Sequence, residues 1–452
     1  MTGRVAGRIA AVIVAVACVA VVARAEERFV VEGNRFVLGQ AMDWLDKTHV
    51  VWQDPTSRDE DGDGQIQVHR STLDGRDKVC LTCGLPGPNQ VPVVQPHGSW
   101  ILFHSWSGRA VRVGSPGFGG LGSELWVMTR DGQRRTNLTR DAEFHDNFHA
   151  YWSPDGKYIV WTSVNWNNNE GGNGKSDIRV PRFDPSGPRL VDEHVVRPGN
   201  GHWYETQWWA PDGSGFLYTE TVDTAINPEL FFCRLPRRSR GVCHPVRLTF
   251  DPGWDEQAIF TNDMRKVLFM SSRDLPGAQN DWAHVATLLE LPAEYDYALI
   301  LPVFLDTYLQ PILQQATDLW ELTLHWNRAR TRFKRGGLRR LTRSGEDGWI
   351  IPEFAWQPGG RRLLWTQNRF AKSRRVDQGC IVRQLRADIV AQLSGVTSII
   401  QVPLMLPNQI RDRAAELIRD PRKYAFGAGC GGDQPTAPQA LEQATRIAHF
   451  ED

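Results

Sequence analysis

The chain has 452 residues, and its 52 basic and 52 acidic side chains give a formal net charge of zero. This balance argues against a nucleic-acid-binding protein, which would carry an excess of positive charge. The 18 tryptophans and 41 glycines are typical of an all-β protein, in which tight turns join strands that pack through aromatic side chains.

Residues 1–25 have the pattern of a secretory signal. Arg4 and Arg8 precede an apolar run over 9–22, and Ala-Arg-Ala then supplies the small residues of a cleavage site. The run is short for a bilayer-spanning helix. We therefore predict a periplasmic or secreted protein that is not an integral membrane protein once the signal is removed. An uncleaved anchor and lipidation at Cys18 are the alternatives.

Six cysteines follow the signal: Cys80, Cys83, Cys233, Cys243, Cys380 and Cys430. An even number in an exported chain indicates disulfides. The middle pair flanks a predicted hairpin and is the pair most expected to bond. The last pair would join the C-terminal tail to the body of the protein. The first pair, in the sequence CLTC, suits either a local disulfide or a redox-active pair, and no second such pair or pair of histidines completes a zinc site.

One unit recurs along the chain: an aromatic residue, a turn of the Pro-Asp-Gly type, and then a dense apolar strand. The clearest copies are YWSPDGKYIVWTS at 151–163, WWAPDGSGFLYTE at 208–220, IFTNDMRKVLFMS at 259–271 and AWQPGGRRLLWTQ at 355–367. Weaker copies begin at Asp43 and Val93. Because this turn sequence favours a type I turn, each copy predicts a β-hairpin. Its second strand is apolar on both faces and must therefore be covered on both sides.

The second half of the unit ends in a common Leu-Thr phrase, in KVCLTC at 78–83, RRTNLTR at 134–140, PVRLTF at 245–250 and LRRLTR at 338–343. Two hairpins per unit give four strands. The aromatic or apolar anchors of the units recur 50 to 58 residues apart, with a final interval of 96: Trp44, Val94, Trp152, Trp209, Phe260 and Trp356. Six four-stranded units of this period predict a β-propeller. A pair of two-sheet sandwiches would not explain the fixed phase of the repeat.

The unit resembles the TolB-type, WD40-like (PD40) propeller repeat, most closely in LTRDAEFHDNFHAYWSPDGKYIVWTS at 138–163. The resemblance covers roughly residues 36–395 and implies the propeller fold. It does not extend to an α/β domain between signal and propeller, which puts a TolB-like assembly role in doubt. Propellers host many unrelated activities, so the resemblance is specific for fold and weak for function.

The predicted fold is an all-β, six-bladed β-propeller of four-stranded antiparallel blades. We assign the signal to 1–25, the propeller to 26–398, and a C-terminal helix and tail to 399–452, with the helix at 403–420. A helical insertion at 293–318 is expected in the fifth blade. The segment RFVVEGNRFVLG at 28–39 is expected to complete the last blade by strand exchange.

The segment RDEDGDGQIQV contains the first half of an EF-hand calcium loop. A true EF-hand is excluded, because Arg70 stands where that motif needs a bidentate Glu. The segment instead connects two predicted strands of the first blade. We predict a weak, structural Ca²⁺ site there, formed by Asp59, Asp61 and Asp63 with the carbonyl of Gln65. A solvated acidic turn is the alternative.

The starts of the innermost strands should line the central channel of a propeller. Two histidines, His145 and His202, lie seven residues before their anchors and so occupy equivalent positions. The candidate ligands at the channel mouth are His145, Asp146, His149, His202, Glu205, Asp255 and Glu256, with Glu353 from the sixth unit. Imidazoles beside carboxylates suit a divalent metal or acid–base chemistry, although polar side chains also fill solvated channels.

These features predict an exported binding or scaffold propeller of the bacterial envelope rather than an enzyme. Its partner would be an envelope protein or a saccharide, and the protein would be monomeric. The alternative is a metal-dependent propeller enzyme, a lyase or hydrolase that could act on saccharides, with ligands at the channel mouth. Convergence of the histidines of the third and fourth units would favour the enzyme.

Overall fold

The computed structural model describes residues 28–36, 40–54, 66–105, 123–140, 146–165, 175–200, 202, 204–222, 227–236, 241–251, 253–275, 316–347, 349, 351, 353–360, 362–370 and 441–451. These residues are almost entirely in strands and turns, and the helical structure among them is a 3-10 turn, η2, at Ser344–Asp347. The described residues form six four-stranded antiparallel sheets and a small two-stranded sheet.

Five of the large sheets follow one another along the chain, each with its strands in near-sequential order. The first two contain β2 (Gln40–Trp44), β3 (His49–Asp54), β4 (Gln67–Thr72) and β5 (Val79–Cys80), then β6 (Asn89–Val94), β7 (Trp100–Ser105), β8 (Glu124–Thr129) and β9 (Arg135–Asn137). The third contains β10 (Asp146–Trp152), β11 (Ile159–Asn165), β12 (Lys175–Arg179) and β15 (Val195–Arg197), beside the pair β13 (Arg182–Asp184) and β14 (Arg189–Val191). The fourth and fifth contain β16 (Tyr204–Trp209), β17 (Gly215–Val222), β18 (Asn227–Arg234) and β19 (His244–Arg247), then β20 (Asp255–Phe260), β21 (Lys266–Ser271), β22 (Asp318–Trp326) and β23 (Phe333–Arg340).

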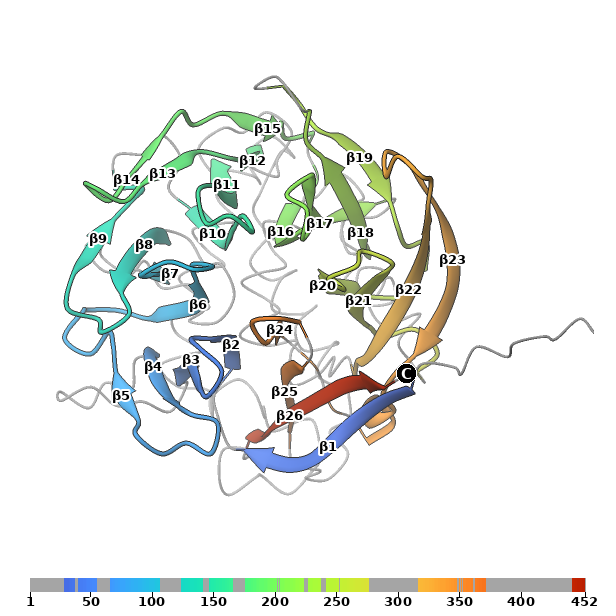
Figure 1. Ribbon diagram of the computed structural model, residues 1–452, viewed down its shortest axis with the longest axis horizontal. Coiled ribbons are helices and arrows are strands. Elements are labelled where there is room, and N and C mark those ends of the chain that lie inside the picture. The colour runs from blue at the N-terminus through green and yellow to red at the C-terminus, as the bar shows by residue number, and fades with distance from the viewer. Residues whose placement is uncertain are drawn as a thin grey trace, which may run out of the picture.

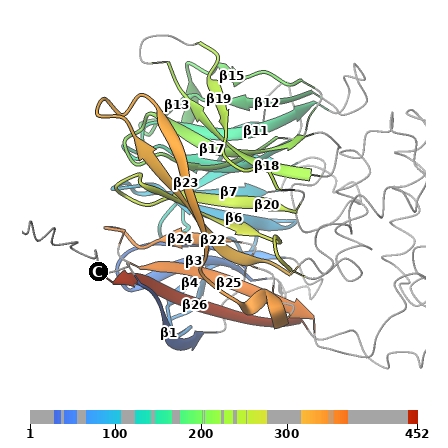
Figure 2. The same ribbon diagram turned by 90° about the vertical axis from the view of Figure 1, so that its right-hand side faces the viewer.

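The sixth sheet is built from both ends of the described chain, in the order β1-β26-β25-β24. Its strands are β24 (Phe354–Trp356), β25 (Leu363–Phe370), β26 (Leu441–Glu451) and β1 (Arg28–Phe36). Figure 1 shows the six sheets arranged around a common axis, with β2, β6, β10, β16, β20 and β24 innermost. Figure 2 shows the same ring of sheets from the side. Radially placed four-stranded sheets of this kind form a β-propeller, whose blades we number one to six from β2 to β24.

Strand exchange closes the ring, as the sequence predicts. β1 pairs antiparallel with β26, with Arg28 opposite Glu451 and Glu32 opposite Ile447. Residues 441–451, expected to lie in a tail outside the propeller, are therefore the third strand of its last blade. The reason is that β24 and β25 alone would leave an open sheet edge, whereas β26 and β1 complete the four-stranded sheet.

The second strand of each hairpin is buried on both faces, as its apolar composition requires. All residues of β7 and of β17 are buried, and in β3 and β21 only the first residue is partly exposed. Side chains of alternating direction therefore pack on the preceding and the following sheet. The apolar core lies between the blades.

The Pro-Asp-Gly turns behave as the sequence predicts. In blade three the amide of Gly156 donates to the carbonyl of Ser153 at 2.8 Å, and Gly156 has φ +68. A Cβ at Gly156 would lie 2.9 Å from the carbonyl oxygen of Pro96 in the neighbouring turn, so both conformation and space require glycine. Blade five places Met264 at the equivalent position with φ +59.

Tryptophans at the ends of innermost strands join neighbouring blades. The indole N–H of Trp152 donates to the carbonyl of Val93 at 3.2 Å, and that of Trp209 donates to the carbonyl of Tyr151 at 3.1 Å. The same bond to the preceding blade is made by two further anchors, Trp44 to Ala355 and Trp356 to Phe260. The repeated tryptophan thus packs between two neighbouring blades and also holds them at a fixed distance through its hydrogen bond.

The Leu-Thr phrase fastens the outer edge of four blades, and we call this arrangement the Leu-Thr clasp. In blade four the amide of Leu248 donates to the carbonyl of Leu230, and the amide of Leu230 donates to the hydroxyl of Thr249 at 2.9 Å. The same two bonds recur in blades one, two and five, through Leu81 and Thr82, Leu138 and Thr139, and Leu341 and Thr342. In each clasp, one residue lies just beyond the last paired residues of the two outer strands. The clasp gives both the amide and the carbonyl of that residue a hydrogen-bond partner.

Two disulfides lie within the described residues. Cys233 and Cys243 are bonded, which confirms the predicted pair. Cys80 and Cys83 are also bonded to each other, so the CLTC pair forms a local disulfide in this structure. The third predicted pair, Cys380 with Cys430, lies outside the described residues.

Several other predictions fall outside the described residues: the signal at 1–25, the acidic loop at 55–65 and the helix at 403–420. The same is true of the expected insertion up to residue 315, and its last residue, Asp318, begins β22. No helix in the described part of the chain is both long and apolar enough to cross a membrane.

Candidate functional site

A bulge recurs at the same place in five of the six innermost strands. We call the region around the axis next to these bulges the channel mouth, and the side chains that meet there the channel cluster. The pairing with the second strand shifts register within β2, β6, β10, β16 and β20. Three residues before the anchor, four of these strands have a residue with positive φ: Ala41, Val91, His149 and Gln257. Such conformations are costly for residues other than glycine, and bulges of this kind re-aim side chains. Polar residues beside the bulge therefore meet at the axis.

Three glutamates from three successive blades come together there. Glu205 on β16 lies beside Glu256 on β20, and, after the larger effect of burial, its charge and hydrogen bonding both raise the pKa of Glu256. Glu256 also accepts a 2.7 Å hydrogen bond from the indole of Trp254. The side-chain amide of Gln257 donates to Glu353 at 3.1 Å, which connects the fifth blade to the sixth.

Two histidines extend this cluster toward the second and third blades. The Nδ1 atom of His149 lies 3.1 Å from Oε1 of Glu205. The angle at this contact does not suit a hydrogen bond, so Nδ1 is buried without a hydrogen-bonded partner. The ring of His149 lies 6.0 Å from that of His104, whose Nε2 accepts a long hydrogen bond from the amide of Ala150.

Burial sets the charge of this cluster. It raises the pKa of Glu353 to about 8, with a further contribution from the charge of Glu256. Burial, followed by the neighbouring Glu205, holds the pKa of Glu256 well above its usual range. Burial lowers the pKa of His149 to about 4, against the attraction of Glu256. Near neutral pH Glu353 therefore holds a proton and the imidazole of His149 is neutral.

Aromatic side chains lie beside the cluster. The ring of Tyr151 lies 5.0 Å from that of Trp208, and its hydroxyl is buried without a hydrogen-bonded partner. The charges of Glu353, Glu205 and Glu256 all raise the pKa of Tyr151, after the larger effect of burial. Trp208, from blade four, packs against three apolar core clusters. One belongs to blades two to four, one to blades one and six, and one to blades five and six. Trp208 therefore reaches across the axis.

Two predicted ligands do not join the channel cluster. Asp255 faces the other side of β20, where it pairs with Arg273 and accepts a hydrogen bond from Ser271. The alternation of side chains along a strand separates it from Glu256. His202 is exposed, and its Nδ1 lies 3.2 Å from Oε1 of Glu220 on β17, the second strand of blade four. The predicted convergence of His202 with the third-blade histidines is thus not observed for His149.

The remaining candidates are only partly described. Asp146 begins β10, but its side chain is not among those described, and His145, Asp59, Asp61, Asp63 and Gln65 lie outside the described residues. Of the residues that the sequence predicts, the structure brings together His149, Glu205, Glu256 and Glu353. Sequence reasoning missed His104, because that residue lies on a second strand, and Gln257, because a bulge cannot be read from alternation. Tyr151 and Trp208 could have been found, since each directly precedes an anchor.

Comparison with known proteins gives similar folds. The sequence matches no family model. It matches no curated protein. Solved structures similar to this chain include TolB proteins. TolB from Acinetobacter baumannii is 13% identical with a TM-score of 0.41, and the match covers 72% of this chain and 61% of that one. A puromycin-hydrolyzing peptidase from Mycobacterium tuberculosis is 12% identical with a TM-score of 0.40, covering 76% and 43%.

An oligogalacturonate lyase in complex with manganese is also similar, at 16% identity and a TM-score of 0.34, with 55% of this chain and 64% of that one covered. The present chain thus spans about three fifths of the Acinetobacter TolB. At such low identity, the chemistry of the site has to be inferred from its own residues.

The spacing of the channel cluster suits a polar ligand better than a single metal ion. Among the described residues, the one group of three His, Cys, Asp or Glu side chains with ligand atoms all within 4.8 Å of one another is His69, Cys80 and Cys83. His149, Glu205 and Glu256 do not form such a group. Their carboxyl and imidazole groups are, however, well placed to accept hydrogen bonds from a cationic group that enters the channel.

Proposed function

We propose that the protein is an exported binding propeller of the bacterial envelope, with these six sheets as its full set of blades. Two disulfides support export to an oxidising compartment.

The acidic segment with Asp59, Asp61 and Asp63 is proposed to hold a structural Ca²⁺. The Ca²⁺ proposal predicts that EDTA lowers the melting temperature of the wild type but not that of the Asp61→Asn variant.

The channel mouth is proposed to bind a cationic group, such as a Lys or Arg side chain of a partner protein. The observation that carries this proposal is the close approach of the carboxyl groups of Glu205 and Glu256, through which Glu205 adds to the effect of burial in raising the pKa of Glu256. An ammonium or guanidinium group bound between them would favour the ionised form of both carboxylates and so displace protons. Binding should therefore release protons and strengthen as the pH rises toward 8.

The experiment measures binding of a short Arg-containing peptide by calorimetry in two buffers with different ionisation enthalpies. We expect net proton release on binding, and a loss of about tenfold or more in affinity for Glu205→Gln or Glu256→Gln. The matched control is Glu193→Gln, which removes an acid at the outer side of blade three. Equal affinities for all three variants and the wild type would contradict the proposal.

An enzyme remains the second candidate because one cluster contains both an acid and a base. Glu353 has a pKa of about 8 and His149 a pKa of about 4, so one is protonated and the other neutral near pH 7. Such a pair suits general acid–base catalysis in a lyase or hydrolase acting on a saccharide. We would test polygalacturonate for chain cleavage in the presence and absence of EDTA. Cleavage that is lost in both Glu353→Gln and His149→Asn would favour the enzyme over the binding module.

A further inference from the structure

A second cluster of reactive side chains lies at the outer edge of blade one, away from the channel. His69 on β4 is directly opposite Cys80 on β5, and Cys80 is bonded to Cys83. The imidazole and the two sulfur atoms offer three ligand atoms that all lie within 4.8 Å of one another. His69 is buried, Cys80 is partly buried and Cys83 is exposed, so the cluster is open to solvent on one side.

The other Leu-Thr clasps show that these three residues depart together from the repeat. At the position of the His69–Cys80 pair, the other clasps pair an aromatic ring with a polar residue: Trp126 with Asn137, Phe231 with Arg247 and Trp320 with Arg340. After the clasp threonine, where blade one has Cys83, the other blades have Arg140, Phe250 and Arg343. Because the other clasps form without them, the fold does not require His69, Cys80 or Cys83 at these positions. The three side chains nevertheless lie together in blade one.

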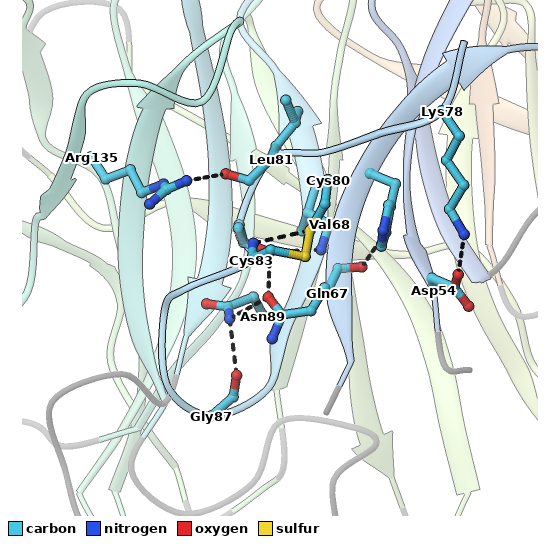
Figure 3. Close-up of a disulfide and its surroundings, with 12 residues drawn as sticks. Asp54, Gln67, Val68, Lys78, Cys80, Leu81, Cys83, Gly87, Asn89 and Arg135 are labelled. Atoms are coloured by element: carbon cyan, nitrogen blue, oxygen red, sulfur yellow. Dashed lines mark hydrogen bonds and ion pairs between the residues drawn. A yellow bond between two sulfur atoms is a disulfide. The ribbon is translucent and has the colours of Figure 1, made fainter. Parts of the chain in front are cut away.

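The clasp holds the two cysteines on a fixed frame. Leu81 and Thr82, which separate them, are 1% and 0% exposed. The hydroxyl of Thr82 accepts from the amide of Val68 at 2.8 Å, and the guanidinium of Arg135 in blade two donates to the carbonyl of Leu81 at 2.7 Å. Figure 3 shows this frame around the disulfide. Opening the disulfide would therefore leave both sulfurs close to where they are.

The imidazole of His69 has the kind of backbone partner that metal-bound histidines commonly have. Its Nδ1 lies 3.3 Å from the carbonyl oxygen of Gln67, which can only accept a hydrogen bond, so Nδ1 carries the proton. The lone pair of His69 is therefore on Nε2. A ring N–H bonded to a backbone carbonyl is the common outer contact of a metal-bound histidine. In addition, the amide of Cys83 points at Sγ of Cys80 at 3.0 Å, a contact that favours a thiolate.

We propose that His69, Cys80 and Cys83 form a redox-controlled site for a thiophilic metal ion, Zn²⁺ or Cu⁺. The oxidised form has a disulfide and offers no thiolate. A dithiol reductant opens it: the reductant loses two electrons and two protons and becomes a disulfide, and Cys80 and Cys83 become thiols. The metal then binds two thiolates and the imidazole, with release of the two thiol protons. Two Cys and one His leave an open fourth position on zinc, whereas three such ligands suit trigonal Cu⁺.

The test uses the full exported chain in its oxidised and reduced forms. After treatment with a phosphine reductant and its removal without oxygen, two thiols are expected per chain at this site. The buried Cys233–Cys243 bond, at 0% and 2% exposure, is the internal reference and should resist reduction under conditions that open the exposed pair. Titration with Zn²⁺ against a chromophoric chelator, and with Cu⁺ against a Cu⁺-specific one, should show one metal ion per reduced chain and none per oxidised chain.

The variants separate a metal site from unspecific thiol binding. We expect His69→Asn to weaken metal binding by about tenfold or more while leaving the thiol count unchanged. The control is His244→Gln, which removes an exposed histidine next to Cys243 and should bind metal as the wild type does. The proposal is overturned if the reduced wild type binds neither metal more tightly than the oxidised form, or if His69→Asn binds as tightly as the wild type. The oxidised wild type serves as the reference without thiolates. Because no cysteine variant is used, the result does not depend on whether such a variant folds.

Discussion

The channel mouth and the Leu-Thr clasps are both built by the same repeat, yet they use it in opposite ways. Each clasp has the same two residues and the same two hydrogen bonds, and its threonine hydroxyl accepts a hydrogen bond from a backbone amide. At the channel mouth the equivalent positions carry different side chains, several of which are buried without a hydrogen-bonded partner. Repeat positions that stay the same therefore hold the fold, and we propose that ligands bind at repeat positions that vary.

The largest expected effect tests the clasp. Replacing Thr249 with Val removes the acceptor of the Leu230 amide in a site that is 0% exposed. An amide left unsatisfied in the core should lower the free energy of unfolding by about 1–3 kcal/mol. Chemical denaturation followed by tryptophan fluorescence measures the change. Thr331→Val, at an exposed turn, is the control and should change stability by less than about 0.5 kcal/mol. Similar losses in the two variants would show that the clasp is not special.

A smaller loss of stability is expected from replacing Trp209, whose indole N–H has a hydrogen-bond partner, and a still smaller one from replacing its neighbour Trp208. Trp209→Phe removes the hydrogen bond to the Tyr151 carbonyl between blades and should cost about 1 kcal/mol beyond the loss of ring area. Trp208→Phe removes an indole N–H that has no hydrogen-bonded partner and should cost less. Thermal unfolding of both variants gives the comparison. A greater loss for Trp208→Phe would mean that the contact across the axis outweighs the bond between blades.

The smallest expected effect depends on pH and concerns the channel. Glu353 has its pKa raised from 4.5 to about 8, so the folded protein holds a proton there that the unfolded chain has released. The stability that this group contributes is complete below pH 4.5 and is lost as the pH rises through about 8. Glu353→Gln keeps the neutral shape and should be more stable than the wild type at pH 9, by a margin that the partial exposure of Glu353 keeps small. At pH 5 the two proteins should unfold alike. A wild-type stability that is flat between pH 6 and pH 9 would argue against a protonated channel.

The fold could be predicted from the sequence because its repeated elements are local. The Pro-Asp-Gly turn, the apolar second strand and the Leu-Thr phrase each lie within about a dozen residues, and their order fixes the sheet. The pairing of β1 into the last blade also followed, since a ring needs its last sheet completed. Residues 441–451 were missed because they lie far from the sixth hairpin and contain neither the anchor nor the turn that marks the other units.

The site could be predicted only in part. Glu205, Glu256, Glu353 and His149 follow from counting back from the anchors. Asp255 was misplaced, because neighbouring residues on a strand face opposite sides and the sequence does not say which side is the channel. Gln257 reaches Glu353 only because a bulge with positive φ turns its side chain, and nothing in the residue types around it predicts such a bulge. His69 beside Cys80 required the register of β4 against β5.

The sixth blade also fixes the order in which this protein can mature. It joins residues 28–36 to residues 441–451, so the ring cannot close until the second of these strands has been synthesised. At roughly 5–20 residues per second, β1 is made roughly 20–80 s before its partner. During that interval the early blades are stabilised only by their neighbours, and β1 presents an unpaired strand edge. Protection of this strand by a chaperone of the compartment would therefore affect the yield of folded protein more than the stability of any single blade.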